Sequence, residues 1–159
     1  MGIGNLILRD DGVGIRIAQK LKEEDPALEV IETSEVGIAL LDLVVGYRKL
    51  IIIDSVKTGK GQPGELYMLK LKNMKPGIDL PSSHGIDIAT AFELGHRLGY
   101  PMPGQIRIYA VEVKNNETFG EGLSPEIEKR IPAIAREIAS REKLTKTPQS
   151  KRAGVGSGI

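Results

Sequence analysis

Four side chains in this sequence have the types and positions that acid–base or metal chemistry requires. Asp10 and Asp11 form an adjacent pair just before an apolar run of helical spacing, Asp54 ends an aliphatic run, and His84 precedes a glycine where a helix is expected. Asp11, Asp54 and His84, each at a helix start or a strand end, form an oxygen and nitrogen set that suits a divalent transition metal with open coordination positions. Their spacing along the chain does not by itself establish that they converge.

Each of these residues also has a plain structural interpretation. Neighbours on a helix point about 100° apart, so Asp10 can cap the helix while Asp11 faces a functional site. In the plain interpretation, both acids merely favour the positive end of the helix dipole. Asp54 can cap the loop that follows it, and His84 can be satisfied by backbone groups. His96, the second of two histidines, lies about 18 Å further along a continuous helix and cannot share an ion with His84. We expect His96 at the surface or in packing.

The first positioning element is the glycine-rich start of the chain. Gly2 and Gly4 allow a tight turn before the acid pair. A helix is expected over residues 10–24, with one apolar face formed by Val13, Ile17 and Leu21. In α/β folds such a turn follows a strand, yet Met1 alone precedes it. The sequence therefore predicts either that the protein begins several residues upstream or that the central strand is absent.

The remaining elements alternate in a way that predicts an α/β fold. The unbroken aliphatic run of residues 49–54 is typical of a strand buried on both faces. We expect further strands at 28–33, 65–72 and 105–113, helices at 35–47 and 85–98, and a long loop at 73–83. Ser124 and Pro125 are typical of a helix start, and Pro132 should bend the helix that follows.

The composition is that of a globular protein. The chain has 159 residues, of which 40% are hydrophobic and 27% charged. We expect one α/β domain at residues 1–142, and a disordered tail at 143–159, where basic residues occur without acids and the end is rich in glycine and serine.

Charge, hydropathy and cysteine content exclude several classes of function. A net charge of +1 gives no reason to expect nucleic acid as a partner. No apolar run approaches the length needed to span a membrane, so we expect no membrane partner. The chain has no cysteine, which excludes disulfides, thiolate metal sites and a cysteine nucleophile, and fits a cytoplasmic protein.

Several motifs occur together in the order found in one known family. The chain opens with Gly2-Ile3-Gly4-Asn5-Leu6 followed by Asp10-Asp11-Gly12-x-Gly14, and continues through Leu50-Ile51-Ile52-Ile53-Asp54, Ser83-His84-Gly85 and a segment with Gly122-Leu123-Ser124-Pro125. This series resembles the nickel–iron hydrogenase maturation endopeptidases. The resemblance covers nearly all of the chain up to about residue 141.

The resemblance implies a phosphorylase-like, three-layer α/β/α sandwich with a mostly parallel central sheet. It implies an aspartyl-type endopeptidase that removes a short C-terminal peptide from the hydrogenase large-subunit precursor after nickel has been inserted. The family's catalytic and nickel-contacting residues fall on Asp11, Asp54 and His84, and the family often has glutamate where Asp11 stands. The precursor is then the partner and carries the nickel, and the free enzyme should be largely metal-free.

The alternative is a non-catalytic α/β module that binds a nucleotide or phosphate through the glycine turn at a helix N-terminus. Gly2 and Gly4 lack the third glycine of the dinucleotide motif, and no phosphate-loop motif is present. Geometry distinguishes the two interpretations. If the side chains of Asp11, Asp54 and His84 diverge, the metal interpretation fails.

Overall fold

A five-stranded sheet forms the centre of the computed structural model, which describes residues 1–35, 37–71 and 85–144. The strand order is β2-β1-β3-β5-β4. The strands are β1 (Gly2–Ile3), β2 (Glu32–Thr33), β3 (Lys49–Val56), β4 (Leu66–Leu69) and β5 (Gln105–Glu112). Neighbouring strands are parallel except for β4, which runs antiparallel to β5. The predicted, mostly parallel central sheet is therefore confirmed.

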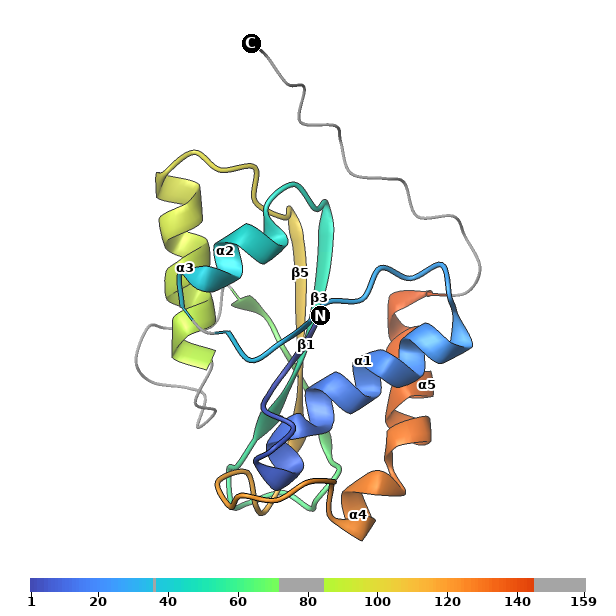
Figure 1. The fold of residues 1–159 in the computed structure, drawn as a ribbon. Helices are drawn as coiled ribbons and strands as arrows, with labels where there is room; N and C mark the ends of the chain where they lie inside the picture. Colours follow the sequence, from blue (N-terminus) through green and yellow to red (C-terminus); the bar gives the residue numbers. More distant parts are fainter. Residues whose placement is uncertain (36, 72–84, 145–159) are drawn as a thin grey trace.

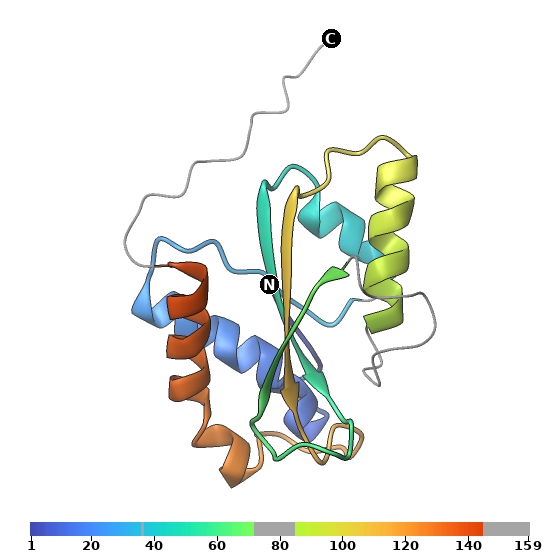
Figure 2. The ribbon, with the colours of Figure 1, turned by 180° about the vertical axis from the view of Figure 1, so that it is seen from behind.

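Helices cover both faces of this sheet and complete three layers (Figures 1 and 2). They are the short 3-10 helix η1 (Arg9–Gly12), α1 (Val13–Glu24), α2 (Ala39–Val44), α3 (Gly85–Arg97), α4 (Pro125–Glu128) and α5 (Ile131–Glu142). Helices α1, α4 and α5 lie on one face, and α2 and α3 lie on the other. No helix in the described ranges is both long and apolar enough to cross a membrane.

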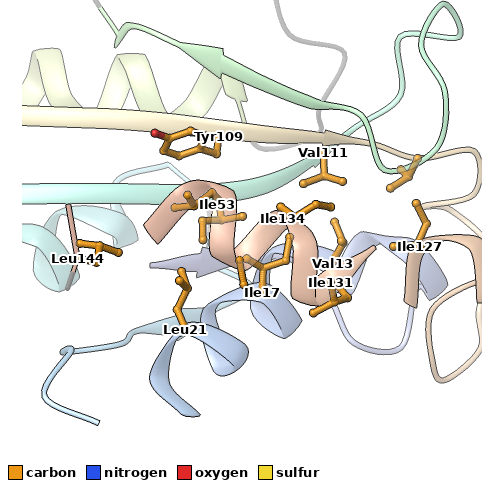
Figure 3. Packing of buried hydrophobic residues seen from close by; sticks show 13 residues of the cluster. Val13, Ile17, Leu21, Ile53, Tyr109, Val111, Ile127, Ile131, Ile134 and Leu144 are labelled. Carbon is orange, nitrogen blue, oxygen red and sulfur yellow. The ribbon is translucent and has the colours of Figure 1, made fainter. Parts of the chain in front are cut away.

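The alternation of side chains along β3 explains why the core has two halves. Ile53 faces the layer of α1 and α5, whereas Ile52 faces the layer of α2 and α3, and each is at most 1% exposed. Figure 3 shows the first half, in which Ile17 of α1 and Ile134 of α5 lie in one cluster with Ile53 and Tyr109 of the sheet. The predicted apolar stripe of Ile127, Ile131, Ile134 and Ile138 is buried throughout. Each such side chain contributes about 1.5–3 kcal/mol to folding.

A strand of two residues, β1, stands at the start of the chain, so the alternative in which this strand is absent is wrong. Gly2 lies within β1, not in a turn, and pairs with Glu32 of β2 and Ile53 of β3. A Cβ atom at Gly2 would lie 2.5 Å from the carbonyl oxygen of Gly14. Gly2 is therefore required by the close packing of α1 on β1, and it is at Gly4 that the backbone turns away.

Several predicted elements are shorter or divided. The strand expected at 28–33 is limited to Glu32–Thr33, and the helix expected at 35–47 to Ala39–Val44. Gly46, at a φ of +87°, lies just beyond the second of these and favours its end. The helix beginning after Ser124 is split into α4 and α5, not bent. Pro132 lies in the first turn of α5, where its missing amide is not needed.

The described fold extends slightly beyond the expected boundary at residue 142. Lys143 ends α5 in a left-handed conformation, and Leu144, 8% exposed, packs into the core. The loop expected at 73–83 and the rest of the expected tail, 145–159, lie outside the described residues.

Candidate active site

Asp11 reaches the end of the central strands through a sharp backbone turn. Gly4 has a φ of +152°, and a Cβ atom there would lie 2.0 Å from the carbonyl oxygen of Asp11. Glycine is therefore needed for η1 to fold back over the end of β1. The Asp11 side chain is 2% exposed, and its Oδ2 accepts a hydrogen bond from the backbone N–H of Asn5 at 2.8 Å.

Asp54 comes from the next strand across and lies close to Asp11. It is 3% exposed, near the carboxyl end of β3. The backbone N–H of Ser55 donates to Asp54 Oδ1 at 2.8 Å, and the hydroxyl of the same serine donates to Asp11 Oδ1 at 3.0 Å. One residue thus contacts both carboxylates, which lie at the same edge of the sheet.

This pair of carboxylates lies where ligand sites form in open α/β sheets. Strand β1 is flanked by β2 on one side and β3 on the other, so the chain reverses its direction of crossing between β1 and β3. Crevices at the carboxyl ends of strands beside such a reversal are the usual binding positions. Asp11 follows β1 and Asp54 lies near the end of β3, one on each side of the reversal.

Asp10 does not cap the helix, contrary to the prediction. The position before α1 is Gly12, without a side-chain cap. The carboxylate of Asp10 instead accepts two hydrogen bonds from Ser124, at 2.6 Å from its backbone N–H and 2.9 Å from its hydroxyl. These bonds tie η1 to the loop before α4, which lies beside it in Figures 1 and 2. The two adjacent acids therefore face different partners, as the helical geometry indicated.

Only one of the two histidines, His96, lies in the described ranges. His84 lies outside the described residues, so its relation to Asp11 and Asp54 stays a prediction. His96 is exposed on α3, as expected. Within the described ranges, no group of three or more histidine, cysteine, aspartate or glutamate side chains is placed to hold a metal ion.

Two polar residues at the same edge were missed by sequence reasoning. Ser55 gives no signal, because a serine in an aliphatic strand is common. Glu112, at the end of β5 and 2% exposed, accepts hydrogen bonds from the N–H and hydroxyl of Thr58 and from the N–H of Gly59, at 2.7–3.1 Å. The sequence does indicate Glu112, since an acid near the end of a buried strand is also the pattern at Asp54.

A cavity of about 490 Å³ lies elsewhere. Its lining includes Met1, Leu28, Ile31, Tyr47 and Leu50, at the amino end of β3. Because Asp54 lies near the opposite end of that strand, the cavity is not part of the carboxylate site.

Comparisons with known proteins assign the chain to a family. The family model HycI, described as hydrogenase maturation protease, matches residues 15–141. The chain belongs to this family. Its function is accordingly that of a hydrogenase maturation protease, and the alternative of a non-catalytic binding module is set aside. The matched range includes Asp54 and His84, and it begins just after Asp11.

Curated relatives and solved structures agree with this assignment. The chain is 25% identical to the hydrogenase 2 maturation protease of Escherichia coli K12 over 146 residues, which cover 88% of this chain and 87% of that protein. It is 28% identical over 140 residues to the hydrogenase expression/formation protein HupD of Thiocapsa roseopersicina, covering 84% of this chain and 62% of HupD.

Among solved structures, the E. coli maturating endopeptidase HybD has the same fold, with a TM-score of 0.74, 23% identity and coverage of 91% and 90% of the two chains. The NiFe hydrogenase maturation protease HybD of Thermococcus kodakarensis has a TM-score of 0.64 and 26% identity, covering 91% of this chain and 96% of that one. The predicted α/β sandwich of this protease is thus confirmed.

Proposed function

We propose that this protease removes a C-terminal peptide from the large-subunit precursor of a nickel–iron hydrogenase, after nickel has been inserted, and that Asp11, Asp54 and His84 act on the precursor. The observation that carries the proposal is that two buried carboxylates, 2% and 3% exposed and both hydrogen-bonded to Ser55, lie at the strand reversal of a chain from this family. The names of the relatives, which include a hydrogenase 2 and a NiFe hydrogenase maturation protease, support a hydrogenase precursor as the substrate.

The donor atoms of the site suit nickel as part of the substrate. Within the described ranges, each oxygen of the Asp11 carboxylate accepts one hydrogen bond, which leaves a further lone pair on each. Carboxylate oxygens and an imidazole from His84 would be the harder ligands, whereas softer thiolates must come from the precursor because this chain has no cysteine. The enzyme would therefore bind nickel weakly alone and purify largely metal-free.

The reaction we infer is an aspartyl-type hydrolysis. One of the two carboxylates takes a proton from a water molecule, and the water oxygen adds to the scissile carbonyl carbon. The carbon–nitrogen bond then breaks, and the departing amine takes up the proton.

The absence of cysteine fits our further proposal that this reaction occurs in the cytoplasm.

The test is to incubate purified enzyme with nickel-loaded and with nickel-free precursor and to measure the mass of the large subunit. We expect the loaded precursor alone to lose a C-terminal peptide, because only the loaded form offers an ion to Asp11, Asp54 and His84. Equal trimming of the two forms would contradict the role of nickel, and trimming of neither would contradict the proposed substrate.

A further inference from the structure

Ser55 touches both candidate catalytic carboxylates. Its backbone N–H donates to Asp54 Oδ1 at 2.8 Å and its hydroxyl donates to Asp11 Oδ1 at 3.0 Å, with the serine itself 1% exposed. We propose that Ser55 is a positioning residue, whose hydroxyl holds the Asp11 carboxylate in the orientation that cleavage requires. This inference rests on the proposed function.

The Asp11 carboxylate is held by a hydrogen bond at each of its two oxygens. Its Oδ2 is held by the backbone N–H of Asn5 at 2.8 Å, and its Oδ1 by the hydroxyl of Ser55. A carboxylate with one such bond can turn about it, whereas bonds to both oxygens fix the plane of the group. Active-site side chains have to be held within roughly 0.5 Å of the productive geometry, and a misplacement of about 1 Å costs roughly 100-fold in rate.

The second argument is electrostatic. Asp11 and Asp54 are acids of like charge in a buried environment, where their repulsion is stronger than in water. A donor to each of them offsets part of that repulsion. Ser55 supplies both donors from one rigid point on β3, so the relative position of the two carboxylates follows that of one backbone unit.

The neighbouring acid provides a matched control. The hydroxyl of Ser124 donates to Asp10 Oδ2 at 2.9 Å, which is the same type of bond made to the adjacent carboxylate. That bond joins η1 to the start of α4 and does not involve Asp11 or Asp54. Removal of either hydroxyl therefore costs a similar amount of stability, but only one removal should disturb the site.

The experiment measures kcat and KM for nickel-loaded precursor with wild-type enzyme, Ser55→Ala, Ser55→Thr and Ser124→Ala. All variants keep the backbone N–H that donates to Asp54, so Ser55→Ala isolates the bond to Asp11. We expect Ser55→Ala to lower kcat by about 10- to 100-fold with KM unchanged, Ser55→Thr to recover most of the loss, and Ser124→Ala to keep the wild-type kcat despite a lower melting temperature.

An unchanged kcat in folded Ser55→Ala, or equal losses of kcat in Ser55→Ala and Ser124→Ala, would overturn the inference. If the extra methyl group of threonine prevents folding, the comparison of the two alanine variants decides alone. Wild-type enzyme that fails to cut loaded precursor contradicts the proposed function and the inference together. Wild-type enzyme that cuts, beside an equally active Ser55→Ala, contradicts the role of Ser55 alone.

Discussion

The two ends of the parallel strands hold buried acids in different ways. At the amino ends, the side chain of Glu142 of α5 is 6% exposed and lies against the sheet. Its carboxylate accepts a hydrogen bond from the hydroxyl of Tyr109 at 2.6 Å and forms an ion pair with Lys49 at 2.9 Å, with Arg107 at 3.9 Å. Burial opposes ionisation of Glu142, but these partners outweigh it, so the pKa of Glu142 is lowered from its usual value.

At the carboxyl ends, the acids are held by neutral donors. Asp11 accepts from a backbone N–H and a serine hydroxyl, and Asp10 accepts from the same two kinds of group on Ser124. In the part of the chain that the structure describes, no lysine, arginine or histidine forms an ion pair with either acid.

The difference separates an acid whose charge is compensated by cations of the fold from acids whose charge is not. A buried carboxylate paired with a cation has its charge compensated inside the protein. A buried carboxylate with neutral donors alone keeps a charge that a substrate cation or a proton can compensate, at some cost in stability. Glu142 belongs to the first kind, and Asp11 belongs to the second.

The largest effect is expected at Gly4, where the backbone turn brings Asp11 to the strand end. Gly4→Ala would place a methyl group 2.0 Å from the carbonyl oxygen of Asp11, at a φ of +152°. We expect a loss of about 4 kcal/mol or more, measured by urea unfolding. Gly104→Ala is the control, because its Cβ would have no atom within 4 Å. A stable Gly4→Ala variant would show that η1 can be displaced without cost.

The opposite end can be tested with Glu142→Gln. The variant loses the ion pair with Lys49, so we expect about 2 kcal/mol less stability, with kcat for the precursor unchanged. Glu137→Gln on the same helix is the control, since its pair with Arg141 is exposed and should contribute less than about 0.5 kcal/mol. A large fall in kcat for folded Glu142→Gln would show that the two ends are not independent.

The pH dependence of stability sharpens this test. Because the pKa of Glu142 is lowered below 4.5 in the fold, its contribution is present above the unfolded pKa and is lost as the pH falls through the folded pKa. The difference in melting temperature between wild type and Glu142→Gln should therefore shrink between about pH 6 and about pH 3. A constant difference would contradict a charged Glu142 as its source.

The smallest expected effect is that of Asp10→Asn. One oxygen remains to accept from Ser124, so we expect a loss of about 1 kcal/mol and a kcat within about twofold of wild type. Thermal unfolding and precursor cleavage measure the two quantities. If Asp10→Asn abolished cleavage in folded protein, the assignment of Asp10 to structure and Asp11 to chemistry would be wrong.

Sequence periodicity correctly predicted the elements whose hydrophobic residues are spaced for burial. The strand at 49–54, the helix at 85–98 and the stripe from Ile127 to Ile138 were all found, since hydrophobic spacing encodes burial directly. That Asp11 and Asp54 belong to one site was expected from the resemblance, because their spacing along the chain does not establish it. The place of His84 stays a prediction from the resemblance.

The errors arose where a distant segment supplies the partner. Asp10 has the sequence of a helix cap, but its carboxylate accepts instead from Ser124, 114 residues away. The role of Gly2 depends on how closely α1 approaches β1, which no local pattern encodes. No sequence pattern indicated Ser55 either, because its role depends on hydrogen bonds to Asp11 and Asp54 that only the folded chain forms.

The most direct test of the central claim is single-turnover cleavage of nickel-loaded precursor by wild type, Asp54→Asn, Asp11→Asn and Glu142→Gln, read from the mass of the large subunit. We predict that each aspartate variant cuts about 10³-fold more slowly, with a melting temperature near that of wild type, whereas Glu142→Gln cuts at the wild-type rate. Cleavage at the wild-type rate by Asp54→Asn would contradict it.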